Sequence, residues 1–149
     1  LESGSQRMLD EMRKGTDLDT TRRFLADAAT AGLSVRVTMI LGYPGERPSD
    51  VEASAAFLEE NADRIERVAL NRFALVTGSR LHRSIEREPA AFADLGALRP
   101  NHRQALLDHQ FAPAREPAYR RAVSRLLGAV HRINRRPIRE AASEFEGVM

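Results

Sequence analysis

Small and polar residues gather at three places where the sequence predicts that strands end. The segment "ESGS" follows Leu1, "GYPGE" follows an apolar run that ends at Leu41, and "FALVTGSRL" contains the end of the apolar run 67–75. In a parallel sheet, all three segments leave the strands at the same edge, where such sheets bind their ligands. We therefore look for chemistry at this edge.

Two charged residues at this edge suit a polar ligand. The carboxylate of Glu2 could accept two hydrogen bonds from a vicinal diol, such as that of a ribose, and Lys14 could meet a carboxylate. Gly42 and Gly45 allow a ligand to approach the backbone closely. Each charge also has a structural alternative, because Glu2 could be an ordinary helix cap and Lys14 a favourable charge at a helix C-terminus.

The segments that would position these residues alternate between helical and extended patterns. Segments 33–41 and 67–75 are mostly apolar and rich in β-branched residues, which is typical of strands buried on both faces. A short helix ending at Gly15 and a second helix ending at Gly32 are expected before the first strand. The order predicts an α/β fold in which residues 1–83 form a parallel sheet with helices on one side.

The turn and the helix between the two strands have their own sequence signals. Pro44 and Gly45 suit the central positions of a type II turn. Ser49 and Glu52 have the spacing of a capping box, which predicts that the next helix begins there.

Beyond residue 83 the pattern changes to helices. Segments 98–110 and 117–135 are the candidates, so residues 84–149 are expected to form a mostly helical C-terminal extension. The apolar stripe of the second candidate comprises Val123, Leu126, Leu127, Val130 and Ile133.

Composition limits the classes of function. The 149 residues are 42% hydrophobic and 30% charged, and no apolar run approaches the roughly 18 residues of a membrane span. The chain has no cysteine, which excludes disulfides, thiolate ligands and a cysteine nucleophile, and its four histidines lack the spacing of metal ligands. We expect a cytoplasmic protein with no membrane partner and no metal site of its own.

The uneven charge leaves alternative functions open. Residues 99–139 hold ten arginines against Asp108 and Glu116, although the whole chain carries only +2. One alternative is a non-enzymatic α/β binding module whose basic helix 117–135 contacts nucleic acid or a protein partner. A solvated helix face explains the same arginines more simply, so nucleic acid is not the favoured partner. Another alternative is a different barrel enzyme that binds phosphate at helix starts near Ser3 or Ser49.

In their order and at their distances, the quoted segments resemble the later part of the radical S-adenosylmethionine (radical SAM) barrel. An "ESGS" strand end, the Lys14-Gly15 pair, a "GYPGE" turn and a "TGSRL" turn are similar to those of its cobalamin-binding-type subgroup. The resemblance covers residues 1–83. It implies the C-terminal half of a (βα) partial TIM barrel, whose missing N-terminal half would be its partner.

The resemblance also implies roles for individual residues. Glu2, with Ser3 beside it, would bind the ribose of S-adenosylmethionine (SAM), and Lys14 would bind its methionyl carboxylate. The adenine would lie against Ile40, Gly42 and Phe73. No catalytic residue and no metal ligand is implied for this chain.

The implied activity belongs to a longer protein. Radical SAM enzymes bind a 4Fe-4S iron–sulfur cluster through a three-cysteine motif in the first part of the barrel, and they generate a deoxyadenosyl radical for C–H functionalisation, which includes methylation. This chain has no cysteine. We therefore expect the full-length parent to be the enzyme and this fragment to be inactive alone. The substrate is expected to be a small molecule or a peptide, and cobalamin is a candidate further cofactor.

Overall fold

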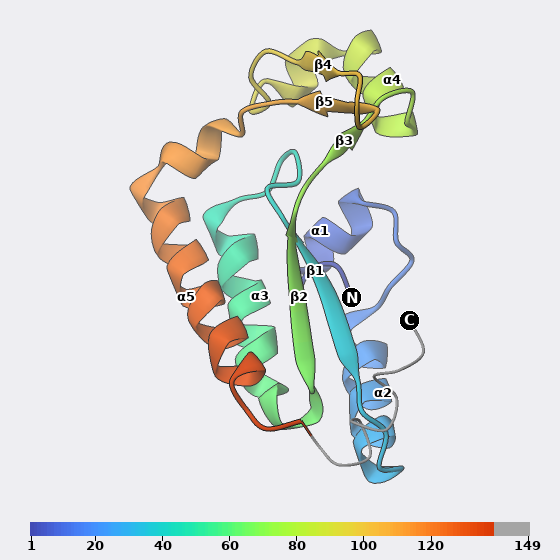
Figure 1. Ribbon diagram of the computed structural model, residues 1–149, viewed down its shortest axis with the longest axis vertical. Helices are drawn as coiled ribbons and strands as arrows, with labels where there is room; N and C mark the ends of the chain where they lie inside the picture. Colours follow the sequence, from blue (N-terminus) through green and yellow to red (C-terminus); the bar gives the residue numbers. More distant parts are fainter. Residues whose placement is uncertain (139–149) are drawn as a thin grey trace.

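The computed structural model describes residues 1–138 and has an α/β fold (Figure 1). The last eleven residues of the expected extension, 139–149, lie outside the described residues. The helices and strands are, in chain order, α1 (Gln6–Glu11), α2 (Leu18–Thr30), β1 (Arg36–Leu41), α3 (Pro48–Glu60), β2 (Arg67–Arg72), β3 (Leu75–Val76), α4 (Arg80–Arg87), β4 (Arg99–Asn101), β5 (Leu106–Asp108) and α5 (Pro117–Asn134).

The main sheet pairs β1 with β2 in parallel, as the sequence predicts. Its register runs from Arg36 opposite Arg67 to Leu41 opposite Arg72. The other edge of β1 meets the start of the chain, because the N–H of Ile40 donates to the C=O of Glu2 at 2.9 Å. Glu2 therefore lies beside the C-terminal end of β1.

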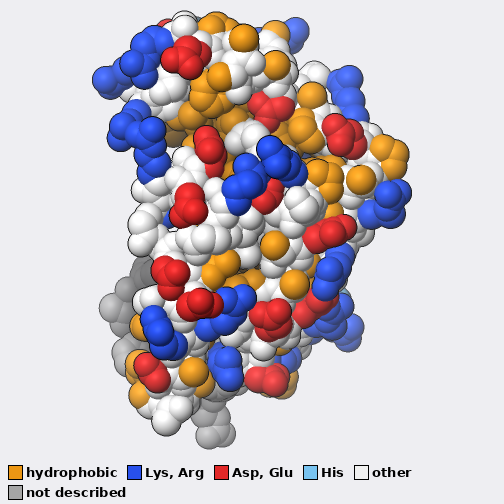
Figure 2. Space-filling model, turned by 180° about the vertical axis from the view of Figure 1, so that it is seen from behind, with side chains coloured by type: hydrophobic (Ala, Val, Ile, Leu, Met, Phe, Trp, Pro, Cys, Tyr) orange, Lys and Arg blue, Asp and Glu red, His pale blue; other side chains and the backbone are white. Residues whose placement is uncertain are grey.

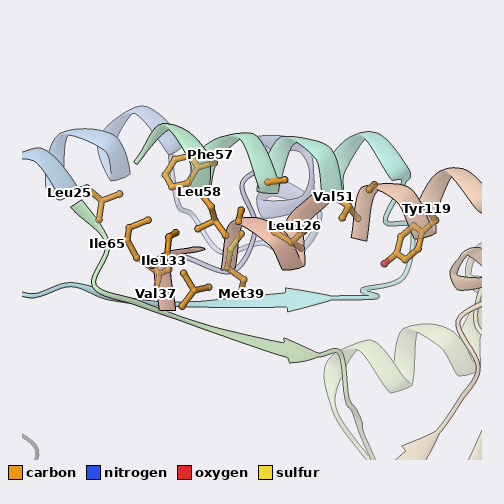
Figure 3. Packing of buried hydrophobic residues seen from close by; sticks show 14 residues of the cluster. Leu25, Val37, Met39, Val51, Phe57, Leu58, Ile65, Tyr119, Leu126 and Ile133 are labelled. Carbon is orange, nitrogen blue, oxygen red and sulfur yellow. The ribbon is translucent and has the colours of Figure 1, made fainter. Parts of the chain in front are cut away.

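The helices pack on one face of this sheet (Figure 3). Val37 and Met39 of β1 point into the helix layer, whereas Thr38 between them is exposed on the other face. The prediction that the strands are buried on both faces is therefore wrong. The helices contribute the following residues to the same core: Leu25 of α2; Val51, Ala55, Phe57 and Leu58 of α3; and Tyr119, Ala122, Leu126, Ala129 and Ile133 of α5.

Helix α2 has a side-chain cap, whereas the predicted cap of α3 is wrong. At α2, the side chain of Asp17 accepts from the N–H of Thr20 at 2.7 Å. The predicted capping box of Ser49 and Glu52 is wrong, because α3 begins earlier, at Pro48. Proline suits a first helical position, and Asp50 accepts from the N–H of the N-cap residue Arg47 at 2.9 Å.

The helix predicted over 98–110 is also wrong. β4 and β5 form an antiparallel hairpin in this segment, and β5 also pairs with β3. Leu107 lies opposite both Pro100 and Leu75, and it is buried in a second, smaller core with Ile85 and Leu95. Burial of Leu107 in an extended segment outweighs the local helical pattern, so the part of the extension that is described is not purely helical.

Helix α5 matches its predicted range but not all of its predicted stripe. Leu126 and Ile133 are buried in the main core, and Val123 and Val130 are partly buried against it. Leu127 is 50% exposed, so its assignment to the stripe is wrong. None of the helices in the described part of the chain has the length and apolar content that crossing a lipid bilayer requires.

Candidate functional site

A rigid corner follows β1 and shapes the edge at which the strands end. The N–H of Glu46 donates to the C=O of Tyr43 at 3.0 Å, and Gly45 has a φ of 78°. This geometry confirms the predicted type II turn, in which Pro44 sets φ and glycine takes the positive φ. Gly42, before the turn, also has a positive φ of 84°.

The buried carboxylate of Glu46 holds this corner together. It accepts from the N–H of Gly42 at 2.8 Å and from the hydroxyl of Tyr119 on α5. Burial raises the pKa of Glu46, and its hydrogen bonds with Tyr119 and Gly42 offset part of the shift. Sequence reasoning missed this role, although the "GYPGE" motif placed the carboxylate at a distance from Gly42 that allows it to close the turn.

Glu2 and Lys14 form an ion pair with each other. The Nζ atom of Lys14 is 2.9 Å from Oε2 of Glu2. This oxygen is buried but makes no hydrogen bond of normal geometry with the protein. Lys14 compensates the charge of this oxygen, and the Glu2 side chain as a whole is 29% exposed.

The rest of "ESGS" faces the helix layer instead. The hydroxyl of Ser3 is 3.2 Å from that of Ser54 on α3, and the hydroxyl of Ser5 donates to Asp50 at 2.7 Å. A Cβ atom on Gly4 would lie 2.6 Å from the Cα of Ser54. The structure therefore packs these three residues against α3, so Ser3 is a neighbour of the candidate ligand site through its backbone rather than its hydroxyl.

The residues predicted to line the adenine lie at the ends of β1 and β2. Ile40 is half-buried at the end of β1, next to the backbone of Glu2. Phe73 follows β2, where its N–H donates to the C=O of Leu41 at 2.8 Å. The structure thus brings Glu2, Ile40 and Phe73 to one edge of the sheet.

Tyr43 is an addition that sequence reasoning did not single out. Its ring meets that of Phe73 edge to face, with 5.1 Å between the ring centroids. Burial raises the pKa of Tyr43, with further contributions from the charges of Glu11 and Glu2. Tyr43 therefore adds a second aromatic ring beside Phe73 at this edge.

The described residues contain no group of three or more histidine, cysteine, aspartate or glutamate side chains arranged to hold a metal ion. The site consists instead of a paired carboxylate and ammonium, two aromatic rings and backbone at the strand ends. Such a set can bind and orient a polar ligand with a flat ring.

The basic helix α5 is partly neutralised within the molecule. Arg125 and Arg132 form ion pairs with Glu59 of α3 at 2.6 Å and 2.9 Å. Figure 2 shows that on the face seen from behind, acidic and basic side chains are interspersed rather than gathered by sign. The ion pairs of Arg125 and Arg132 with Glu59 do not favour the alternative in which α5 binds nucleic acid.

Comparison with known proteins finds relatives for part of the chain. "Ribosomal protein uS12 methylthiotransferase RimO" of Flavobacterium psychrophilum is 40% identical to this chain over 58 residues. The protein of that name from Roseiflexus sp. is 38% identical over 73 residues. The one from Anaeromyxobacter sp. is 35% identical over 81 residues. The three matches cover 38%, 48% and 53% of this chain, but only 13%, 15% and 17% of the relatives. No family model and no solved structure matches.

Proposed function

We propose that this chain, which belongs to the radical SAM superfamily, supplies the part of a radical SAM barrel that binds the nucleoside end of SAM. The observation that carries the proposal is the partly exposed carboxylate of Glu2, which is paired with Lys14 at 2.9 Å beside the C-terminal end of β1. A carboxylate has several lone pairs, so Glu2 can remain paired with Lys14 and still accept hydrogen bonds from the two hydroxyls of a ribose.

The sheet supports a partial barrel rather than a complete one. β1 and β2 are parallel, with the backbone of Glu2 beside β1, in the order expected for consecutive barrel strands. In the described part of the chain, no strand pairs with the outer edge of β2. The side chain of Asn134 on α5 lies there instead and forms hydrogen bonds with both the N–H and the C=O of Val68. An open barrel needs such a protected edge.

The chain's own residues would bind and orient SAM. Glu2 would accept from the ribose hydroxyls, and Lys14 would meet the methionyl carboxylate. Tyr43 and Phe73 would shield the adenine side from water, next to the backbone of Ile40 and Gly42. When bound, SAM supplies the deoxyadenosyl group for radical chemistry, while the protein provides orientation and exclusion of water.

The residues of this chain do not fit the iron–sulfur cluster that the superfamily implies. There is no cysteine, and the described residues form no other set of metal ligands. We assign the cluster to other segments of the parent protein, and this chain alone is proposed to be inactive.

The names of the relatives refine the proposed activity of the parent protein. They are methylthiotransferases that act on a ribosomal protein, which favours a polypeptide substrate and transfer of a methylthio group over simple methylation. They give no support to cobalamin, which stays a prediction from the resemblance.

Calorimetry of SAM binding to the full-length parent, with its cluster reconstituted, tests the proposal. Glu2→Ala should weaken binding about ten- to a hundredfold, because hydrogen bonds to a charged group are lost at a desolvated site. Glu52→Ala, which removes an exposed carboxylate from α3, is the matched control and should leave the affinity unchanged. Equal affinities of the wild type and Glu2→Ala would contradict the ribose assignment.

A further inference from the structure

A second concave site lies beyond the strand ends. An open cavity of about 610 Å³ is lined by residues from the ends of β1 and β2, the segment 109–115 and the first half of α5. Neither Glu2, Lys14, Ile40 nor Tyr43 lines it. Its volume lies in the range of sites that bind small organic molecules.

The cavity carries positive charge and no negative charge. Arg72, Arg115 and Arg120 line it, and no aspartate or glutamate does. Arg115 donates to the amide oxygen of Gln110 at 2.8 Å, which leaves its charge uncompensated. Among the residues that the structure describes, none forms an ion pair with Arg72 or Arg120.

The unpaired arginines contrast with their neighbours on α5. Arg125 and Arg132 also lie on this helix, but both are bound to Glu59. The helix therefore neutralises the arginines that face α3 and leaves Arg120 uncompensated at the cavity. Guanidinium groups bind phosphate through paired, charge-assisted hydrogen bonds, so the chemistry of this cavity suits a phosphate.

Aromatic rings form another part of the cavity wall. Phe111 and Tyr119 meet edge to face with centroids 5.4 Å apart, and Phe73 lies 5.5 Å from the ring of His109. Gly42 contributes no side chain, which leaves the wall open next to Phe111. Rings of this kind contact a planar base favourably.

We propose that this cavity binds a nucleoside monophosphate, with the phosphate between Arg72, Arg115 and Arg120 and the base against Phe111. Inorganic phosphate would leave the aromatic wall and most of the volume empty. This inference does not depend on the SAM site, because the two sites share only Gly42 and Phe73. Phe73 contacts Tyr43 on one side and His109 on the other, so it forms the partition between them.

Titration of the 149-residue chain with AMP, followed in amide NMR spectra, tests the proposal. We expect saturable shifts of amides in the segment 109–115 and at the start of α5. Arg72→Gln and Arg120→Gln should each weaken AMP binding about tenfold, and adenosine should bind at least about tenfold more weakly than AMP, because each change removes charge-assisted hydrogen bonds.

Two controls separate this cavity from the SAM site. Arg121→Gln removes an arginine of α5 that does not line the cavity, and it should leave AMP binding unchanged. Glu2→Ala should also have no effect on AMP, whatever it does to SAM. The proposal is wrong if AMP at about 10 mM produces no shifts of the lining amides. The free energy of binding would then be weaker than about 3 kcal/mol. It is equally wrong if adenosine binds as tightly as AMP, or if Glu2→Ala abolishes AMP binding while Arg72→Gln does not.

Discussion

Glu46 determines the shape of the corner that both candidate sites share. Glu46 is only 3% exposed. Its carboxylate accepts hydrogen bonds from the N–H of Gly42 in its own turn and from the hydroxyl of Tyr119 on α5. The turn itself follows from Pro44 and Gly45, which are adjacent in the sequence. The contact with Tyr119 could not be predicted, because 73 residues separate the two side chains.

Glu46 should make stability depend on pH. Burial raises its pKa, so ionisation costs more free energy in the folded state than in the unfolded state. The contribution of Glu46 to stability is therefore complete below the ordinary carboxyl pKa of about 4.3 and falls as the pH rises through the raised value. Glu46→Gln stays neutral, so its free energy of unfolding should increase relative to the wild type over this range.

Urea denaturation of the wild type and Glu46→Gln at about pH 4 and about pH 7 measures this difference. Tyr119→Phe provides the complementary measurement. It removes the hydroxyl that stabilises the ionised carboxylate, so it should destabilise the protein more at the higher pH. A constant difference between Glu46→Gln and the wild type at both pH values would contradict the assigned cost of ionisation.

At the scale of elements, the end of α5 completes the edge of β2. Val68 donates its N–H to Oδ1 of Asn134 at 2.8 Å and accepts from Nδ2 at 2.9 Å, which are the two bonds that a neighbouring strand would make. Asn134→Ala should cost about 1–2 kcal/mol of stability, because both backbone groups lose their partner.

Two further variants make this prediction specific. Asn134→Asp keeps the acceptor for the N–H of Val68 but places a carboxylate oxygen against its C=O, so it should destabilise the protein as well. Arg135→Ala alters the exposed neighbour and should change the free energy of unfolding by less than about 0.5 kcal/mol. Chemical denaturation measures all three, and equal values for Asn134→Ala and Arg135→Ala would rule out the edge contact as a source of stability.

The elements that sequence reasoning identified correctly are those with strong local signals. The positions of the two parallel strands and of α5 depend on residues close together in the chain, and the structure confirms them. The hairpin at 98–110 depends on the pairing of Leu107 with Leu75, which local periodicity does not contain. At the candidate site, the order of strands and helices allowed Glu2 and Lys14 to lie at one edge but did not require the contact between their charged groups. The role of Tyr43 could not be predicted, because it depends on the packing of its ring against Phe73.

At the scale of the whole molecule, α5 belongs to the same core as the parallel sheet. Its residues Leu126 and Ile133 contact the cluster that contains Met39 of β1 and Phe57 of α3. The helix layer that covers the sheet is therefore built from both ends of the chain. We infer that the described residues of the main core unfold together rather than in two steps divided near residue 83.

Substitutions of two adjacent leucines of α5 test whether the core unfolds cooperatively. Leu126 is 2% exposed, and Leu127 is 50% exposed. Leu126→Ala should cost about 2–5 kcal/mol, because it leaves a cavity between α5, α3 and the sheet, whereas Leu127→Ala should cost less than about 1 kcal/mol. Urea denaturation followed by far-UV circular dichroism and by NMR signals of Val37 and Met39 measures both variants. If α5 is part of one cooperative core, Leu126→Ala shifts the midpoint of every probe equally. A shift confined to signals of α5, with Val37 and Met39 unchanged, would show that the sheet folds without this helix.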